Sequence, residues 1–253
     1  VSKNRAITTS DDMTTILWDL NIGKPIHQFF GHTHKVMSAA VSEKRGLAAT
    51  AGWDGKINIW DLLTLKKISE IKVNSPINSI TFLGESEKIA VGGHNRIIFV
   101  FDAILGQLLG KMEGHSMAVT ELCSSKDGTK LLSSSIDGSV RLWKISNFTQ
   151  IKTFQGHKKQ VYSVKFLKGE KSAVSSGSDG LIIHWDLQTG KILNRIFTDQ
   201  KMIWSLTASS DGRFVISGGS DEKAKIWHLG TGDKISITID RASEPKPWLT
   251  SDH

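Results

Sequence analysis

Three sets of polar residues in this sequence combine the side-chain types of a hydrolytic triad. Each set holds a His, a Ser or Thr and an Asp, followed by a Trp. The sets are His32/Thr50/Asp54/Trp60, His115/Ser133/Asp137/Trp143 and His157/Ser175/Asp179/Trp185. A His between a hydroxyl and a carboxylate is the arrangement that activates a serine nucleophile. Three copies at a constant interval argue against catalysis and indicate a structural role.

The interval is a property of the whole chain. An aromatic residue closes a strand-like apolar stretch six times, usually before an Asp, and successive aromatic residues lie 41 or 42 positions apart. These residues are Trp18, Trp60, Phe101, Trp143, Trp185 and Trp227. Such regular markers define an internal repeat, which is typical of solenoids and propellers.

Each repeat divides into four short strands. In the fifth repeat, alternating and β-branched patterns predict strands over residues 161–166, 173–177, 181–185 and 192–197. Ser178-Asp179-Gly180 is a hairpin turn, because Asp-Gly supplies the positive φ that such turns need. No helical periodicity is present. The sequence therefore predicts an all-β propeller with four-stranded antiparallel blades.

With these features the chain resembles the WD-repeat family of β-propellers over residues 1–240. The family's Gly-His dipeptide occurs at Gly31-His32, Gly114-His115 and Gly156-His157. Its turn aspartate precedes the strand Trp by six residues in five repeats: Asp12, Asp54, Asp137, Asp179 and Asp221. Because buried polar groups need partners, we expect each complete set to form one connected network inside its blade.

Two repeats depart from the pattern. The third has Val91, Asn95 and Phe101 at the Ser, Asp and Trp positions and lacks Gly-His. The sixth keeps Ser217/Asp221/Trp227 but has Asp199-Gln200 in place of Gly-His. Either these repeats have lost the motif residues without any functional consequence, or their loops have become available to bind a partner.

Both ends of the chain carry expectations. Residue 1 falls in the second strand of a repeat, so the first blade is incomplete and the six repeats give 23 strands. Propellers of this family most often close with seven blades, and an open ring exposes a sheet edge. We therefore expect at least one strand, and a further blade, before residue 1. Residues 241–253 break the period and predict a linker leaving the propeller.

That linker contains Glu244-Pro-Lys-Pro-Trp248. It resembles the segment that joins WD-repeat propellers to a c-type haem domain in some bacterial periplasmic proteins. The resemblance implies a periplasmic electron-transfer protein with a covalent haem c beyond residue 253; the alternative is a cytoplasmic protein. Cys-x-x-Cys-His is absent and Cys123, the one cysteine, suits a packed strand, so we expect no cofactor in residues 1–253.

The amino-acid composition indicates which classes of partner are favoured. The net charge is +7 and the pI about 9.4, which favours acidic partners, including acidic or redox proteins. The lysines are scattered, so nucleic acid is a weaker candidate. Apolar runs such as residues 97–101 are too short to span a membrane. Phosphate-loop, zinc-protease and metal-ligand motifs are absent, so we assign no catalytic, cofactor-binding or metal-binding residue.

Partner specificity is expected on one rim of the propeller. The turns between second and third strands share a face with the residues that begin the first strands. We predict seven partner-binding residues there: Lys35, Met37, Trp53, His94, Lys158, Tyr162 and Trp204. Aromatic residues and Met are enriched at interface hot spots. The alternative is ordinary packing against neighbouring blades.

The main functional hypothesis is a non-catalytic protein-interaction scaffold, which rests on the family resemblance. Within it we favour the propeller of the periplasmic cytochrome protein, with a cytosolic or nuclear eukaryotic-type adaptor as the rival. Two alternatives are an enzyme or small-ligand site at the channel mouth and direct nucleic-acid binding, which would show a steep dependence on salt.

Overall fold

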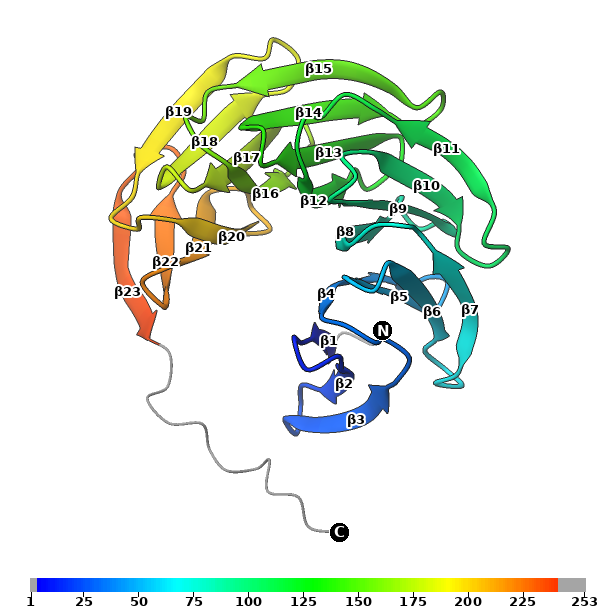
Figure 1. Ribbon diagram of the computed structural model, residues 1–253. Helices are drawn as coiled ribbons and strands as arrows, with labels where there is room; N and C mark the ends of the chain where they lie inside the picture. The colour runs from blue at the N-terminus through cyan, green and yellow to red at the C-terminus, as the bar shows by residue number, and fades with distance from the viewer. Residues whose placement is uncertain (1–3, 241–253) are drawn as a thin grey trace.

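The structure, a computed structural model, describes residues 4–240. These residues form 23 β-strands in six antiparallel sheets, which follow one another along an arc around a common axis (Figure 1). The expected all-β propeller is confirmed, with six blades in this part of the chain. The strand and blade expected before residue 1, and the linker expected at 241–253, lie outside the described residues. Within 4–240 there is no helix that could cross a membrane.

Each sheet is one blade, numbered here in chain order. Blade 1 has three strands: β1 (Arg5–Thr9), β2 (Thr15–Asp19) and β3 (Lys24–Phe29). Blade 2 consists of β4 (Val36–Ser42), β5 (Leu47–Gly52), β6 (Lys56–Asp61) and β7 (Lys67–Lys72). Blade 3 consists of β8 (Ile77–Phe82), β9 (Lys88–Gly93), β10 (Ile98–Asp102) and β11 (Leu108–Met112).

The last three blades repeat the same order. Blade 4 consists of β12 (Val119–Ser124), β13 (Lys130–Ser135), β14 (Ser139–Lys144) and β15 (Thr149–Gln155). Blade 5 consists of β16 (Val161–Phe166), β17 (Ser172–Gly177), β18 (Leu181–Asp186) and β19 (Ile192–Phe197). Blade 6 consists of β20 (Ile203–Ala208), β21 (Phe214–Gly219), β22 (Lys223–His228) and β23 (Lys234–Asp240).

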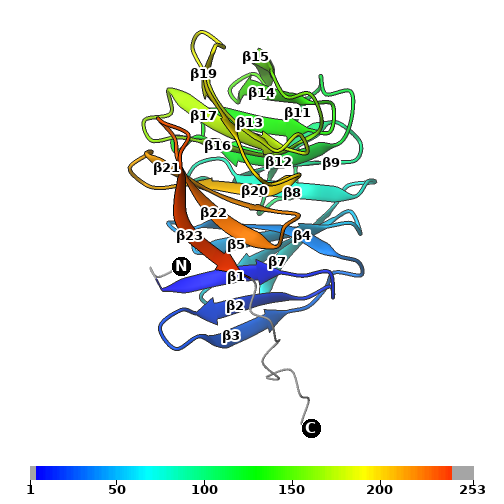
Figure 2. The same cartoon turned by 90° about the vertical axis from the view of Figure 1, so that its left-hand side faces the viewer.

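In each four-stranded blade the first strand lies nearest the axis and the last lies on the outside (Figure 1). The side view in Figure 2 shows β1–β3 at the lower end of the molecule and β15 and β19 at the upper end. Successive innermost strands contact one another from β4 through β8, β12 and β16 to β20. The blades therefore pack in chain order.

Apolar side chains between the blades form the core. Strand β5, with the sequence LAATAG, is buried at all six positions because it is covered by blades on both sides. Small residues suit this double coverage. Leu17 and Phe29 of blade 1 pack with Ala48 and Trp60 of blade 2. Each Å² of apolar surface buried in this way contributes about 25 cal/mol.

A repeated polar contact ties the inner edges of the blades together. A side chain on one innermost strand accepts the backbone N–H of a residue on the next innermost strand. Ser38 accepts from Ile80 (3.2 Å), Ser79 from Leu122 (3.0 Å), Glu121 from Val164 (2.7 Å) and Ser163 from Leu206 (3.2 Å). These contacts satisfy N–H groups that an unpaired strand edge would expose.

Candidate interaction face

The polar set of blade 5 forms a connected network. His157 Nδ1 lies 3.0 Å from both carboxylate oxygens of Asp179, and His157 Nε2 lies 2.8 Å from Ser175 Oγ. The Trp185 indole N–H donates to the same Ser175 Oγ at 2.8 Å. A carboxylate only accepts, so Nδ1 carries a proton, and in the neutral ring Nε2 then accepts the Ser175 hydroxyl proton. The network ties the loop after β15 to the turn between β17 and β18.

The same contacts recur in blades 2 and 4. His32 Nε2 lies 2.9 Å from Thr50 Oγ1, and Trp60 Nε1 donates to that oxygen at 3.1 Å. His115 lies 2.8 Å from Asp137 and 2.7 Å from Ser133, which also accepts from Trp143 at 2.8 Å. Burial shuts these sets off from any substrate, because Thr50, Ser133 and Ser175 are each 0% exposed.

Hydrogen bonding sets the charge state of the network carboxylates. Burial alone would raise the pKa of Asp179, but hydrogen bonds from His157 and from the backbone N–H groups of Lys158 and Leu181 outweigh it. The pKa of Asp179 therefore lies below its usual value. The pKa of Asp137 is lowered in the same way: burial opposes the shift, and His115 and Ser139 overcome it.

Blade 6 keeps a network that its sequence did not reveal. Gln200 occupies the histidine position: its Nε2 donates to Asp221 Oδ1 at 2.7 Å, and its Oε1 accepts from Ser217 Oγ at 2.5 Å. Trp227 Nε1 donates to Ser217 Oγ at 2.9 Å. The buried Lys225 ammonium pairs with Asp221 at 2.6 Å and with Asp199 at 2.7 Å. This loop is held in place rather than freed.

Blade 3 has an apolar interior instead. Val91 and Phe101 are buried where the other blades carry a hydroxyl and a Trp. The Asn95 side chain forms a hydrogen bond within its own turn, accepting the backbone N–H of Ile97 at 3.4 Å. Phe101 stacks with Phe99 at a ring-centroid distance of 6.1 Å.

Backbone hydrogen bonds place two sets of loops on one face. The residue before each turn Asp or Asn donates its N–H to a residue that leads into the first strand of the same blade. The donor–acceptor pairs are Trp53–Lys35 (2.9 Å), His94–Pro76 (3.0 Å), Ile136–Ala118 (3.0 Å), Ser178–Gln160 (2.9 Å) and Ser220–Met202 (3.0 Å). We call this surface the turn face. At Gly177 a Cβ would collide with the Gln160 carbonyl, so the close approach requires glycine there.

A β-bulge opens every innermost strand at the turn face. In each of the five four-stranded blades the register with the second strand skips one residue: Met37, Asn78, Thr120, Tyr162 and Trp204. A bulge leaves its extra residue unpaired and re-aims that side chain. The sequence predicted Met37, Tyr162 and Trp204 as binding residues without predicting the bulge that sets their direction.

The five bulged side chains fall into two groups. Asn78 Nδ2 donates to the Val119 carbonyl at 2.8 Å, and Thr120 Oγ1 donates to the Val161 carbonyl at 2.7 Å, so both link their blade to the next. Met37 and Tyr162 make no such link among residues 4–240, and Trp204 lies in the last described blade. Met37 is 38% exposed, Trp204 is 54% exposed, and Tyr162 is half-buried with its hydroxyl on Gln160 Oε1 at 2.8 Å.

Trp53 lies in a cluster that joins blades 1 to 3. Its ring contacts His34 and His94 at centroid distances of 5.7 and 5.5 Å. Its indole N–H donates to Asn78 Oδ1 at 3.1 Å, and the Lys35 ammonium lies 5.5 Å from its ring centroid. Lys35 also forms an ion pair with Asp11. Trp53 and Lys35 are therefore engaged within the chain, whereas His94 keeps an exposed surface.

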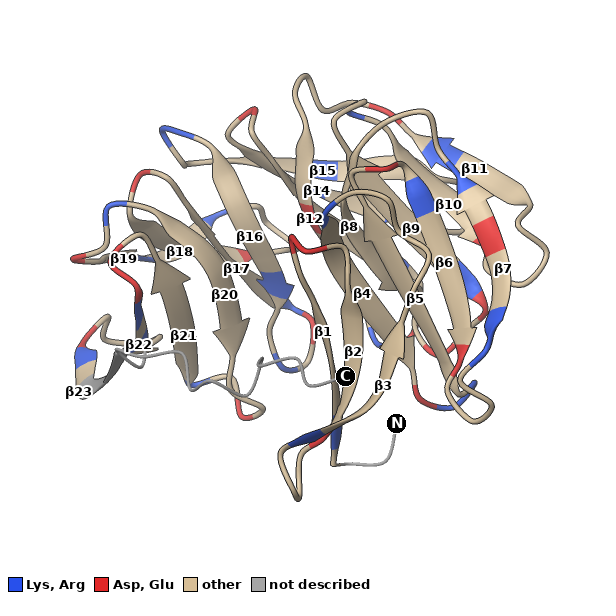
Figure 3. Ribbon diagram, turned by 60° about the horizontal axis from the view of Figure 1, so that its bottom comes forward, with Lys and Arg blue, Asp and Glu red and all other residues tan. Residues whose placement is uncertain are grey.

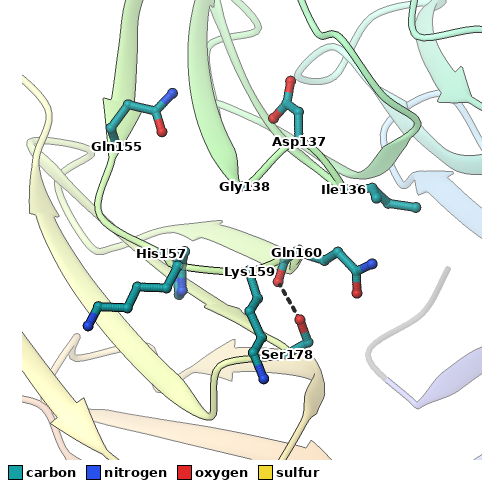
Figure 4. Close-up of a pocket in the computed structure, with 9 residues that line it drawn as sticks. Ile136, Asp137, Gly138, Gln155, His157, Lys159, Gln160 and Ser178 are labelled. Atoms are coloured by element: carbon teal, nitrogen blue, oxygen red, sulfur yellow. Dashed lines mark hydrogen bonds between the residues drawn. The ribbon is translucent and has the colours of Figure 1, made fainter.

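A hollow of about 350 Å³ lies on the turn face between blades 4 and 5 (Figure 4). Its lining residues are Ile136, Asp137, Gly138, Gln155, His157, Lys158, Lys159, Gln160 and Ser178. Lys158 and Lys159 are exposed, and neither ammonium has an ion pair within the described residues. Elsewhere, basic and acidic residues are interspersed over the blades (Figure 3). The described chain holds no group of three His, Cys, Asp or Glu placed to bind a metal.

Four stretches of the chain match the family model described as "WD domain, G-beta repeat": residues 23–61, 106–144, 148–186 and 191–228. Together they cover more than half of the sequence. The chain belongs to the WD-repeat family. The unmatched stretch between the first two matches contains β8–β10 of blade 3, the blade without the polar network.

The relatives compared below with this WD-repeat chain are eukaryotic proteins. A U3 small nucleolar RNA-associated protein 15 homolog of Xenopus tropicalis is 32% identical over 60% of this chain and 30% of its own length. The COMPASS component SWD3 of Saccharomyces cerevisiae is 30% identical over 58% and 50%, respectively. A ribosome biogenesis protein WDR12 homolog of Trichoplax adhaerens is 34% identical over 53% and 32%. The chain thus spans half or less of these relatives.

These relatives correct two expectations. The predicted bacterial periplasmic location is wrong, since the relatives are eukaryotic proteins named for nucleolar, COMPASS and ribosome-biogenesis roles. The interpretation as a propeller fused to a c-type cytochrome domain finds no support among them. The short tail resemblance misled because the residues that carried it lie outside the repeats, where no periodic pattern constrains the interpretation.

Proposed function

We propose that this WD-repeat chain is a non-catalytic scaffold that binds an acidic protein segment through its turn face. The carrying observation is that β-bulges in blades 2 and 5 present Met37 and Tyr162 without a hydrogen bond to the next blade, and that the equivalent bulge in blade 6, the last described blade, carries the exposed Trp204. An aromatic side chain displayed in this way gains more from burial under a partner than from its contacts in the free chain.

Charge favours an acidic partner. Lys158 and Lys159 border the hollow next to Tyr162, and the chain carries a net charge of +7. A carboxylate bound there would meet two ammonium groups that lack ion pairs among residues 4–240. The role needs no metal, haem or other cofactor.

The setting we propose is a eukaryotic multiprotein assembly in the nucleus or cytosol. Support comes from relatives whose names describe components of such assemblies, including COMPASS and ribosome biogenesis. An enzymatic role is disfavoured because the hydroxyls of the three triad-like sets are buried and already bonded to His and Trp.

Quantitative co-purification followed by titration tests this role. The full-length protein is tagged, its partner is identified and titrated, and Trp204→Ala and Lys158→Glu are compared with the unmodified protein. The matched control is Leu193→Ala, because Leu193 on outer strand β19 has the same 54% exposure as Trp204. We expect the turn-face variants to bind the partner at least tenfold more weakly, and we expect the control to bind as the unmodified protein does. Equal binding by all variants contradicts the proposal. If the protein binds RNA and no protein partner, nucleic-acid binding becomes the better hypothesis.

A further inference from the structure

The end of β14 breaks a charge pattern that the other blades keep. In blades 1, 2, 3 and 5 the strand next to the outermost one (β2, β6, β10 and β18) ends in an Asp that accepts backbone N–H groups of the following turn. Asp61 Oδ1, for example, accepts from Leu63 at 2.8 Å and Thr64 at 2.7 Å. Blade 6 uses His228, whose Nδ1 accepts from Thr231 at 3.2 Å. Blade 4 has Lys144, which cannot accept a hydrogen bond.

Strand register makes this exception a like-charge pair. Lys144 lies directly opposite Lys130 on β13. The corresponding pairs in blades 1 and 3 are Arg5–Asp19 and Lys88–Asp102, which combine opposite charges. Like charges directly opposite each other destabilise a sheet. Neither Lys130 nor Lys144 has a hydrogen bond or ion pair through its ammonium in the described part of the chain.

The acidic side chains near the two lysines accept hydrogen bonds from other groups. Asp127 accepts hydrogen bonds from the Ser125 hydroxyl (2.6 Å) and from the backbone N–H of Thr129 (2.9 Å). The charge of Lys130 makes a smaller contribution to lowering the pKa of Asp127. Glu170 of blade 5 accepts the backbone N–H of Lys126 at 2.6 Å. A carboxylate between Lys130 and Lys144 would therefore come from outside residues 4–240.

An apolar hollow adjoins the two lysines. It has a volume of about 500 Å³ and almost wholly apolar walls, formed by Gly128, Thr129, Lys130, Lys144, Ile145, Ser146 and Ile151. We call it the blade 4 groove. Ile151 is the extra residue of a bulge in outer strand β15 and is 45% exposed. On the other side of the same turn, Phe148 packs against Gly110 of blade 3.

We propose that the blade 4 groove binds an acidic, aliphatic segment of a partner protein. An aliphatic side chain of the segment covers Ile145 and Ile151, and a flanking carboxylate lies between Lys130 and Lys144. The groove is built from turns that join first to second and third to fourth strands, so it lies at the end of the blade opposite the turn face. The scaffold can thereby hold two partners at once.

Fluorescence anisotropy with labelled 12-residue peptides tests the proposal on the full chain. The probe alternates Leu and Ile with Asp and Glu; one comparison peptide replaces Leu and Ile with Ser, and another replaces the acids with their amides. We expect saturable binding of the probe and at least tenfold weaker binding of both comparison peptides. Equal binding of the Ser peptide reduces the site to charge attraction and overturns the proposal, as does failure of the probe to bind.

The decisive variant is Lys144→Asp, which restores the residue type of blades 1, 2, 3 and 5. It should reduce probe binding at least tenfold without lowering the melting temperature, because the new carboxylate can pair with Lys130 and cap the turn. Lys168→Asp on the corresponding turn of blade 5 is the charge-matched control and should bind normally, as should Trp204→Ala. Unchanged binding by Lys144→Asp overturns the proposal, and so does a chain dimer that this variant dissociates. Because Trp204 is not in the groove, this outcome is independent of the turn-face test.

Discussion

Gln200 Nε2 donates a 2.7 Å hydrogen bond to Asp221 Oδ1, which places a glutamine amide where three other blades have an imidazole. A side-chain amide carries both a donor and an acceptor, so it can serve Asp221 and Ser217 together as a neutral histidine does. The network of blade 6 needs one donor for Asp221 and one acceptor for Ser217, and a glutamine or a neutral histidine can supply both.

Removing the Gln200 amide should destabilise the protein. Gln200→Ala leaves Asp221 and Ser217 without their shared partner in a buried site, which costs about 1–3 kcal/mol. Gln200→His should retain most of the stability, because the imidazole restores the arrangement of blades 2, 4 and 5. Thermal denaturation checks both, with exposed Gln188→Ala as the control. An unchanged melting temperature for Gln200→Ala contradicts the structural role of this network.

Asp179 should make stability depend on pH. Its pKa is lower in the folded chain than in the unfolded chain, so the unfolded chain binds more protons in acid. The resulting stabilisation is complete above the unfolded-state pKa of about 3.9 and is lost as the pH falls through the lower folded-state pKa. We expect Asp179→Asn to flatten the acid fall in unfolding free energy measured with urea. Asp233→Asn, at an exposed carboxyl, should keep the full slope.

Asp179→Ala tests the same network at neutral pH. It leaves the buried Nδ1–H of His157 and the backbone N–H groups of Lys158 and Leu181 without their acceptor, which costs about 1–3 kcal/mol. A thermal scan of Asp179→Ala with an unchanged midpoint would refute the structural role assigned to the set.

Blade 3 should open locally more often than blade 5. Strands β9 and β17 are buried to nearly the same extent, but only β17 carries a member of a buried polar network, Ser175. We expect amide hydrogen exchange to be faster in residues 89–93 than in residues 173–177. In Asp179→Ala the protection of β17 should fall toward that of β9. Equal protection of the two strands in the unmodified protein contradicts the idea.

The 42-residue period predicted the ladders well because each strand bonds to its neighbour in sequence. The expected strands 161–166 and 192–197 agree with β16 and β19. Contacts between blades were harder to predict. Trp53 meets His94, 41 positions away, and Asn78, 25 positions away, through side-chain directions that strand spacing does not specify. The facing pair Lys130–Lys144 likewise becomes visible only through the strand register.

The contacts between blades change what we expect of Trp53 and Trp204, for which the sequence predicted the same role. Both Trp53 and Trp204 were predicted to bind a partner. Trp53 donates a hydrogen bond to Asn78 and packs against two His rings, so Trp53→Ala should lower the melting temperature as well as weaken binding. Trp204 is 54% exposed, so Trp204→Ala should change stability by no more than about 0.5 kcal/mol.

Titration of the identified partner and thermal denaturation, measured on the same preparations, separate the two roles. We expect Trp204→Ala to weaken binding at least tenfold, equivalent to about 1.4 kcal/mol, because an aromatic hot spot can contribute 2 kcal/mol or more. Trp185→Ala supplies the scale for a buried network Trp, whose loss costs about 3–5 kcal/mol of stability. If Trp204→Ala binds normally but melts early, Trp204 is a packing residue. The partner surface would then have to lie away from the turn face, and the exposed outer-strand residues Leu193 and Phe197 would be tested next.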